Sequence, residues 1–429
     1  MPSHAGPNTA GESNIVFSYD TGDTSNSYRG EPTTNLWDTM LNTQSLRSHT
    51  KHFWDGKQWI VDATYTHPGV DGPKGVYLGL VFKHVSGAFN STWSGTSYGY
   101  MLRDIACTSG ATMTQSVWIY LSENCNLDGV PSAIEQESGG ESSVAGYAPQ
   151  YDLNNKGTWQ VIAKKAISDG QVRFIPLYPR KNGTTVGEFT GFLMWALPQV
   201  TYGDHVVQPI QPGTIRSATQ GLLPLIGNTS INLSSVSFDS NAQIVFDGTD
   251  DFIESTTNLT PLQDLTSGTA ELIFKWNGST SYIVLLHLFA GSSYYGTTIG
   301  LGNWTGAYDN ESIIFMVSNA SGTDLTSQTY YRNGTFTYRD GLYHHLVVTT
   351  NGSIVQMYLD GNQLSLTSTA SSKFSPPTIT KLQLGKRDFN SGTGFHSGEI
   401  PITKIYNTAL SANQVKQNYQ QYKTRFNLS

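Results

Sequence analysis

Charged residues are scarce in this chain of 429 residues, because Asp, Glu, Lys and Arg together make up only 13% of it. Soluble globular proteins usually contain about 25% charged residues. Lys and Arg number 25 against 32 Asp and Glu, which gives a formal net charge of −7. Binding to nucleic acid depends on clustered Lys and Arg, and the sequence contains no such cluster. The composition therefore argues against nucleic acid as a partner.

Long apolar segments are also missing. The longest apolar run, residues 283–290, is interrupted by His287 and is far shorter than the ~20 residues that span a membrane. The first 12 residues are rich in Gly, Pro and Ser and contain no apolar stretch. We therefore expect no membrane insertion and no secretory signal peptide.

Cysteine is nearly absent, with Cys107 and Cys125 as its two occurrences. The two side chains can form a disulfide or remain free thiols, because so low a cysteine count fits a protein made in the cytoplasm equally well.

Glycine and aromatic residues are abundant, with 43 Gly and 12% Phe, Trp and Tyr. Short β-branched or aromatic runs, bounded by Gly, Asn, Asp or Ser, recur along the chain and predict strands. They are residues 59–65, 75–82, 116–121, 159–163, 188–195, 270–276, 312–317 and 345–349. The Asp-Gly pairs at 55–56 and 360–361 predict tight hairpins, in which both central residues need positive φ.

One helix is predicted, over residues 411–423. Ser411 and Gln414 have the spacing of a capping box, and Val415, Tyr419 and Tyr422 form an apolar stripe that would pack on a sheet. Many short strands and one terminal helix predict an all-β fold, with two antiparallel β-sandwich (jelly-roll) domains and one short C-terminal helix. Residues 201–227 are rich in Pro and Gly and are interpreted as the crossing between the domains.

Catalytic patterns are weak. A sandwich glycosidase needs two carboxylates that flank the substrate, but the Glu-x-Asp-x-x-Glu strand pattern does not occur. Gly95-Thr-Ser-Tyr-Gly99 matches the Gly-x-Ser-x-Gly sequence of a serine-hydrolase nucleophile elbow. That elbow leads into a helix, and no helical pattern follows this segment. His344 and His345 are neighbours on a predicted strand and so point to opposite faces. We therefore predict that the protein is not an enzyme.

Asp247, Asp250 and Asp251 lie together in a predicted tight turn. Three carboxylates so close together could bind Ca²⁺, which prefers oxygen ligands. The alternative, which we favour, is a turn stabilised by its own Asp side chains. Calcium is the one cofactor that the sequence suggests.

Aromatic side chains in predicted loops are candidates for stacking on sugars, because their flat faces match the apolar faces of pyranose rings. Trp118, Trp195 and Trp276 lie on predicted strands and are expected in the core instead. The candidate glycan-binding residues are Trp54, Trp59, Trp93 and Tyr100 in the first half of the chain, and Tyr294, Tyr295, Trp304 and Tyr308 in the second half.

The segment 244–252 resembles the strand and turn that open many concanavalin A-like (laminin G-like) lectin/glucanase domains. Residues 342–361 are similar to the paired central strands and hairpin of that family, and residues 400–415 with the following helix resemble its closing segment. The resemblance covers about residues 222–426. It implies a lectin-like sandwich, but no sugar-contacting residue can be carried over, and a shared fold does not establish a function.

Two other segments, residues 19–36 and 212–222, resemble structural proteins of tailed bacteriophages, in particular marine, cyanophage-like ones. This resemblance implies a carbohydrate-binding-module-like jelly roll at residues 36–212, inserted into the laminin G-like domain. The expected organisation is a leader at 1–13 that docks on a neighbouring subunit, a strand segment at 14–35 that belongs to the second domain, the jelly roll, a linker at 213–221, and the laminin G-like domain at 222–429.

We therefore expect a protein of the virion surface, a capsid decoration or tail-fibre subunit made in the host cytoplasm. Its expected partners are other virion proteins, further copies of itself (a trimer by resemblance) and a polysaccharide that it binds weakly and multivalently. A purely structural subunit without a ligand is the main alternative, and a polysaccharide-degrading enzyme is the least favoured one.

Overall fold

The computed structural model describes most of the chain, and every statement below concerns the described residues. These are residues 12–24, 26–37, 60–62, 81–88, 91–93, 96–98, 101–126, 142–177, 180–182, 188–207, 210, 215–239, 242–278, 282–291, 295–302, 312–318, 327–331, 338–367, 373–387 and 394–428. They fold into two compact units. Unit 1 comprises residues 1–32, 217–239 and 243–429, and unit 2 comprises residues 33–216 with 240–242.

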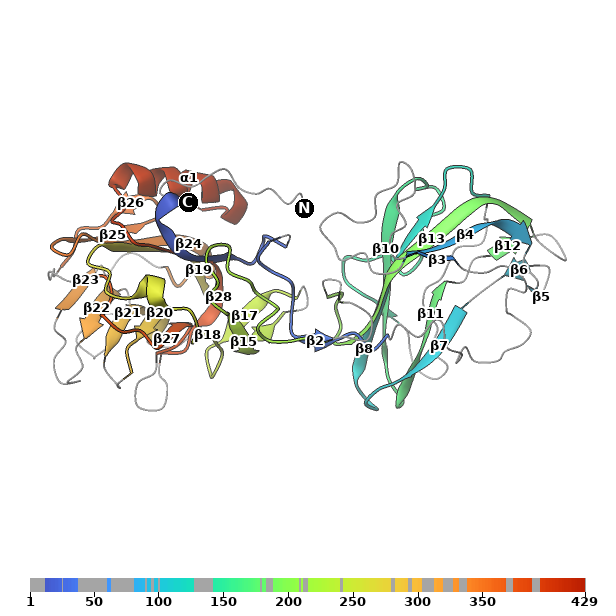
Figure 1. The fold of residues 1–429 in the computed structure, drawn as a ribbon, viewed down its shortest axis with the longest axis horizontal. Coiled ribbons are helices and arrows are strands. Elements are labelled where there is room, and N and C mark those ends of the chain that lie inside the picture. The colour runs from blue at the N-terminus through green and yellow to red at the C-terminus, as the bar shows by residue number, and fades with distance from the viewer. Residues whose placement is uncertain are drawn as a thin grey trace. The chain divides into compact units, whose positions relative to one another are not determined.

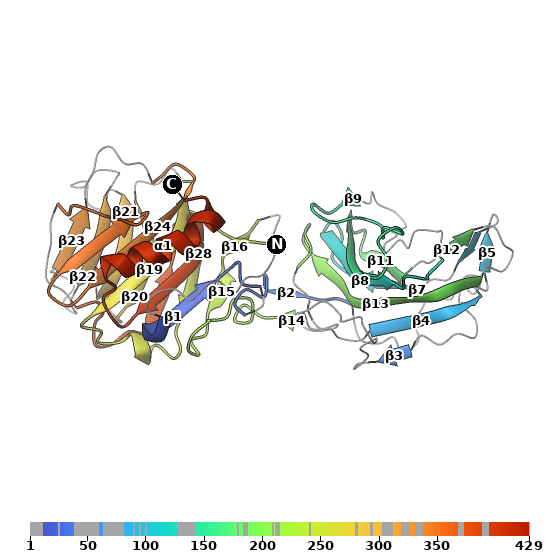
Figure 2. The same cartoon turned by 90° about the horizontal axis from the view of Figure 1, so that it is seen from above.

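Unit 1 contains two antiparallel sheets (Figures 1 and 2). The eight-stranded sheet has the order β16-β17-β28-β19-β24-β25-β26, with β1 also paired to β28. Its strands are β1 (Ile15–Asp20), β16 (Ser237–Phe238), β17 (Ile244–Asp247), β19 (Gly268–Trp276), β24 (Tyr343–Thr350), β25 (Val355–Leu359), β26 (Asn362–Gln363) and β28 (Ser397–Tyr406). The seven-stranded sheet has the order β15-β18-β27-β20-β21-β22-β23. Its strands are β15 (Asn232–Ser235), β18 (Phe252–Ser255), β20 (Tyr282–Phe289), β21 (Gly296–Gly302), β22 (Ile313–Ser318), β23 (Ser327–Tyr331) and β27 (Lys381–Leu384).

The core of unit 1 lies between these sheets. Leu272 and Leu346 from the eight-stranded sheet belong to one buried cluster with Leu286 and Ile299 from the seven-stranded sheet. Because successive strand residues point to opposite faces, every second residue of each strand faces this core. The described elements outside the sheets are two short 3₁₀ turns, Glu12–Asn14 and Thr260–Leu262, and helix α1 (Ala412–Phe426). The predicted all-β class with one terminal helix is confirmed.

Helix α1 lies across the outer face of the eight-stranded sheet (Figure 2). Ser411 and Gln414 form the predicted capping box. Tyr419 and Tyr422 pack against Ile273 and Ile402 of the sheet, so the predicted apolar stripe is confirmed. The helix is too short and polar to cross a membrane, and so are the other described helical segments.

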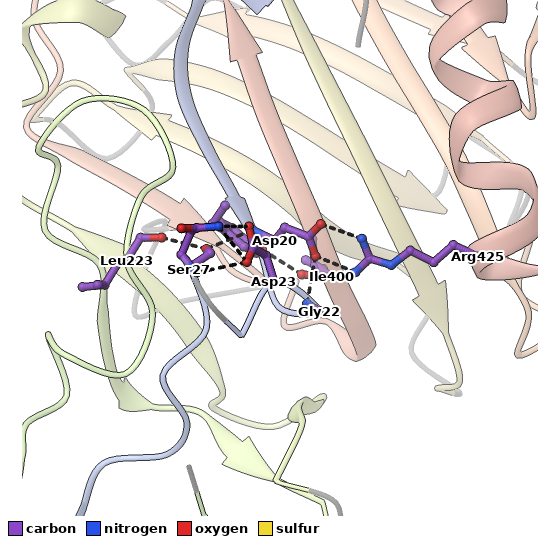
Figure 3. Close-up of polar contacts among 9 residues, drawn as sticks. Asp20, Gly22, Asp23, Ser27, Leu223, Ile400 and Arg425 are labelled. Carbon is purple, nitrogen blue, oxygen red and sulfur yellow. Dashed lines mark hydrogen bonds and ion pairs between the residues drawn. The ribbon is translucent and has the colours of Figure 1, made fainter. Parts of the chain in front are cut away.

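Strand β1 joins the eight-stranded sheet by pairing with β28 from Ile15 to Asp20. Side-chain hydrogen bonds stabilise the turn that follows β1 (Figure 3). The Arg425 guanidinium donates two hydrogen bonds of 2.5 Å to the Asp20 carboxylate, and the Ser27 hydroxyl donates to the Leu223 carbonyl at 2.7 Å. The start of the described chain is thus tied to helix α1 and to the segment after unit 2.

Unit 2 contains a six-stranded sheet in the order β3-β4-β13-β8-β10-β9 and three smaller sheets, β11-β7, β12-β6-β5 and β14-β2. The strands are β2 (Thr33–Thr34), β3 (Ile60–Asp62), β4 (Val81–Ala88), β5 (Ser91–Trp93), β6 (Thr96–Tyr98), β7 (Met101–Ala106), β8 (Thr112–Leu121), β9 (Ser142–Ser143), β10 (Trp159–Ile167), β11 (Gln171–Leu177), β12 (Arg180–Asn182), β13 (Glu188–Tyr202) and β14 (Ile215–Arg216). Strands β2 and β14 pair with each other. Residues 33–34 and 215–216 therefore belong to unit 2, whereas the sequence placed them in the 14–35 segment and in the linker.

Cys107 and Cys125 are both free thiols. Cys107 is half-buried with its Sγ 2.9 Å from the Ser168 hydroxyl, and Cys125 is buried.

Candidate functional site

The outer faces of the two sheets in unit 1 differ in what covers them. Helix α1 packs on the eight-stranded sheet. On the seven-stranded sheet, Ile253, Leu382 and Leu384 point into the core, so the residues beside them in sequence point outward. We call the outward group on β18, β27, β20 and β21 the polar strip. Its members are Phe252, Glu254, His287, Phe289, Thr298, Lys381 and Gln383.

The strip runs across four strands in register. Glu254 lies opposite Gln383, Gln383 opposite His287, and His287 opposite Thr298. The Gln383 amide donates to the Glu254 carboxylate at 2.8 Å. Nδ1 of His287 lies 3.0 Å from the Thr297 carbonyl oxygen, and since a carbonyl only accepts, the proton is on Nδ1. The hydrogen bonds fix the orientation of these side chains.

The strip is buried in the middle and half-exposed at the β18–β27 edge. Gln383 and His287 are 0% and 1% exposed, whereas the side chains of Glu254 and Lys381 are 22% and 33% exposed. Phe252 is also half-buried. A ligand can therefore reach the edge of the strip, where a carboxylate, an ammonium group and an aromatic ring lie close together.

Two lysines lie over the aromatic rings of the strip. Nζ of Lys386 is 3.5 Å from the centroid of the Phe252 ring, and Nζ of Lys381 is 5.7 Å from that of Phe289. Lys381 is also 3.5 Å from Glu254. Such an edge offers hydrogen-bond donors and an acceptor beside partly exposed aromatic rings, a combination found in sites for small polar ligands.

The strip does not have the arrangement of a glycosidase. That chemistry needs two carboxylates about 5–9 Å apart across the substrate. Among the described members of the strip, Glu254 is the single carboxylate. The Glu399 carboxylate belongs to the other sheet, where it binds Lys275 at 3.1 Å and accepts a hydrogen bond of 2.5 Å from Tyr343.

The Asp247, Asp250 and Asp251 carboxylates come together in the turn before β18, with one oxygen of each within 4.8 Å of the others. The turn uses two of them. Asp251 accepts from the backbone N–H groups of Ser237 and Asp247, and Asp247 accepts from those of Thr249 and Asp250. Burial raises the pKa of Asp251 and the charge of Asp247 adds to this, against the hydrogen bonds from Ser237 and Asp247. The arrangement has the geometry of a self-stabilised turn, and its remaining oxygens are the atoms that could hold Ca²⁺.

The predicted sugar-stacking residues are mostly outside the described residues. Those outside are Trp54, Trp59, Tyr100, Tyr294, Trp304 and Tyr308. Trp93 ends strand β5, but its side chain is also outside the description. Tyr295 is half-buried just before β21, and its carbonyl accepts from the Ala290 N–H at 2.9 Å. The described residues therefore do not test this set, and the role of all eight residues stays a prediction.

The sequence interpretation missed the polar strip. A signal was present in Lys381-Leu-Gln-Leu384, in which every second residue is apolar, as in a strand with one face toward the core. The predicted binding residues were instead Trp and Tyr in loops. Trp276 is fully buried as predicted, and the side chain of Trp195 is outside the description.

Unit 2 carries a separate aromatic group on β8 and β10. The rings of Tyr120 and Trp159 are 5.7 Å apart, and Trp159 lies opposite Tyr120 in the register. Trp118 lies two residues before Tyr120 and so points to the same face. Trp118 and Trp159 are half-buried, so the prediction that Trp118 is a core residue is wrong.

Part of the chain is similar to a known protein family. Residues 247–416 match the family model described as the concanavalin A-like lectin/glucanases superfamily. A comparison with curated proteins finds no match.

Solved structures show weaker similarity. The binding domain of botulinum neurotoxin serotype G aligns with 47% of this chain at 9% identity and a TM-score of 0.36, and the alignment spans about half (48%) of that domain. The CBM40 domain of the Ruminococcus gnavus IT-sialidase, bound to α2,3-sialyllactose, aligns with 35% of this chain and 81% of its own length, at 13% identity and a TM-score of 0.29. The NanB sialidase of Streptococcus pneumoniae aligns over 40% of this chain and 26% of its own, at 17% identity and a TM-score of 0.32.

The strand order of the two sheets and the family match together identify the sandwich. The fold of unit 1 is a concanavalin A-like sandwich, within which residues 247–416 match that family model.

Proposed function

We propose that this protein is a non-catalytic glycan-binding protein, and that the edge of the polar strip contacts the sugar. The observation that carries the proposal is the half-exposed group of Phe252, Glu254 and Lys381 on the outer face of a lectin-type sandwich. A pyranose presents hydroxyl groups around an apolar face. The Glu254 carboxylate can accept from a hydroxyl, and the Lys381 ammonium can donate to one.

The burial of Gln383 supports this assignment. Its amide holds the Glu254 carboxylate in place, so the acceptor is oriented before the ligand arrives. Binding costs less conformational entropy when the binding group is already fixed. The lack of a second carboxylate among the described members of the strip supports binding rather than hydrolysis.

The proposed setting is the surface of a phage particle, as a decoration or fibre-type subunit. The resemblance of residues 19–36 and 212–222 to structural proteins of tailed phages supports this setting. Many copies on one particle would convert a weak single-site affinity into a useful avidity. A homotrimer is the assembly we propose, again on that resemblance.

The test is a glycan array with the intact protein, presented as a multivalent complex, and the variant Glu254→Gln. We expect binding to weaken about tenfold or more, because a charge-assisted hydrogen bond contributes ~1.5–3 kcal/mol. Glu399→Gln is the matched control, because the Glu254 and Glu399 side chains are each 22% exposed and each paired with one lysine.

The control should bind as the unmodified protein does. Equal loss in both variants would contradict the assignment of the strip. If the multivalent protein bound no glycan on the array, the proposed glycan-binding function would be rejected. A structural subunit without a ligand would then be favoured.

A further inference from the structure

Residues 338–342, which we call the strap, lead into β24 and contact both sheets of unit 1. The Tyr338 hydroxyl donates to the Ser312 carbonyl at 2.6 Å, at the start of the seven-stranded sheet's β22. Arg339 donates from Nε to the Gly278 carbonyl at 2.8 Å, just after β19 of the eight-stranded sheet. The strap therefore joins the two sheets.

The strap also covers Trp276, the last residue of β19. The Tyr338 ring stacks on Trp276 with centroids 6.1 Å apart and planes at 20°, and the Arg339 guanidinium lies 4.8 Å from the Trp276 ring centroid. Trp276 is 0% exposed. Opening of the strap would thus expose a large apolar ring to water, at a cost that favours the closed form.

His344 connects the strap to the β25–β26 hairpin. Its Nδ1 is 2.8 Å from the Asp360 carboxylate, and its Nε2 is 3.2 Å from the Asp340 carboxylate of the strap. A carboxylate accepts hydrogen bonds, so both ring nitrogens satisfy their partners only when both carry a proton. The geometry is that of an imidazolium between two carboxylates.

Two carboxylates of the described residues face His344. The hairpin contributes Asp360, which also accepts from the backbone N–H of His345 at 2.8 Å. The strap contributes Asp340, and β19 contributes the uncharged ring of Phe274 at 5.7 Å. The His344 and Asp360 side chains are each 5% exposed, and that of Asp340 is 31% exposed. A neutral His344 would leave the buried Asp360 charge without its cationic partner.

We infer that His344 is a pH-sensitive clasp, which holds the strap closed when protonated and releases it as the solution becomes alkaline. Burial opposes protonation of His344, but the hydrogen bonds and charges of Asp360 and Asp340 outweigh burial and raise its pKa above 6.5. In the open form His344 loses Asp340 but keeps Asp360, so its pKa there lies below that of the closed form. The clasp is therefore fully effective below the pKa of the open form and is lost as the pH rises through the higher pKa of the closed form.

The experiment is hydrogen–deuterium exchange of the strap peptide in the intact protein, between pH 5.5 and 9.5, after correction for intrinsic exchange. The opening constant should rise by up to about tenfold per pH unit between the pKa of the open form and that of the closed form, and level off above the latter. In the His344→Gln variant the strap should open readily, and its opening constant should be the same at every pH.

Asp340→Asn provides an independent test, because its amide oxygen still accepts from Nε2 while its charge is gone. The plateau should then begin at a lower pH than in the unmodified protein. Asp264→Asn is the control, since that exposed carboxylate pairs with Lys373, and its profile should be unchanged. A strap whose opening does not depend on pH, or an Asp340→Asn profile that coincides with that of the unmodified protein, would overturn the inference.

Discussion

The carboxylates Glu271 and Glu254, on the two outer faces of unit 1, differ in their contact with solvent. Beneath helix α1, Glu271 and His345 are 0% exposed and lie 2.8 Å apart. Tyr406 and Asn418 donate to the second oxygen of Glu271 at 2.5 and 3.1 Å. On the seven-stranded sheet, by contrast, Glu254 stays half-exposed beside a lysine.

The difference follows from the partners that surround each of the two carboxylates. Burial opposes ionisation of Glu271, but the hydrogen bond from His345 and the charges of His345 and Lys404 outweigh it and lower the pKa of Glu271. Its charge is thus completely enclosed by partners from β24, β28 and the helix. Glu254 keeps contact with solvent, so a ligand can reach it.

The largest expected effect comes from breaking the enclosed network. Glu271→Gln removes the charge that His345, Tyr406 and Asn418 surround, and loss of one partner from a buried ion pair costs about 3–5 kcal/mol. We expect the free energy of unfolding in urea to fall by that amount. Glu254→Gln should change it by less than about 1 kcal/mol, because an exposed pair contributes little.

Equal losses of stability in these two variants would contradict the distinction between the faces. A double variant, Glu271→Gln with Asn418→Ala, separates the helix contact from the rest. The two changes should be non-additive, because the two side chains share one hydrogen bond.

Local signals in the sequence predicted the secondary structure well. Ser411 and Gln414 lie three residues apart, and the capping box they predict is present. Asp360 and Gly361 have φ values of 49° and 75°, as the predicted hairpin requires. Such features depend on neighbours in the chain, which the sequence displays directly.

The polar strip and the enclosed network depend instead on distant residues. Glu254 and Gln383 are 129 positions apart, and Glu271 and Asn418 are 147 apart. Strand register brings the first pair together, and the packing of helix α1 on the sheet brings the second pair together. A shift of one residue in a strand would reverse which side chains face the core. Glu271 in particular looks like a solvent-facing residue of a strand, because its helix partner is not visible from the strand itself.

A smaller effect is expected where the start of the described chain meets helix α1 (Figure 3). The Asp20–Arg425 pair is bidentate, but the Arg425 side chain is 40% exposed, so Arg425→Gln should lower the free energy of unfolding by about 1 kcal/mol or less. A Cβ added at Gly22 would come within 2.1 Å of the guanidinium. Gly22→Ala should therefore displace the arginine and give a similar loss. A loss above ~2 kcal/mol in urea unfolding would mean that the pair holds β1 in place.

The smallest effect is expected at the Asp247–Asp251 turn. Asp250 is exposed, and its side chain is not needed for the backbone hydrogen bonds that Asp247 and Asp251 accept. Asp250→Asn and removal of divalent cations with EDTA should therefore each shift the free energy of unfolding by less than about 0.5 kcal/mol. If the turn bound Ca²⁺, addition of the ion at 100 times its Kd would instead stabilise the protein by ~2.7 kcal/mol. Thermal unfolding with and without calcium distinguishes the two, and a calcium-dependent rise in Tm that Asp250→Asn abolishes would show that the turn is a metal site after all.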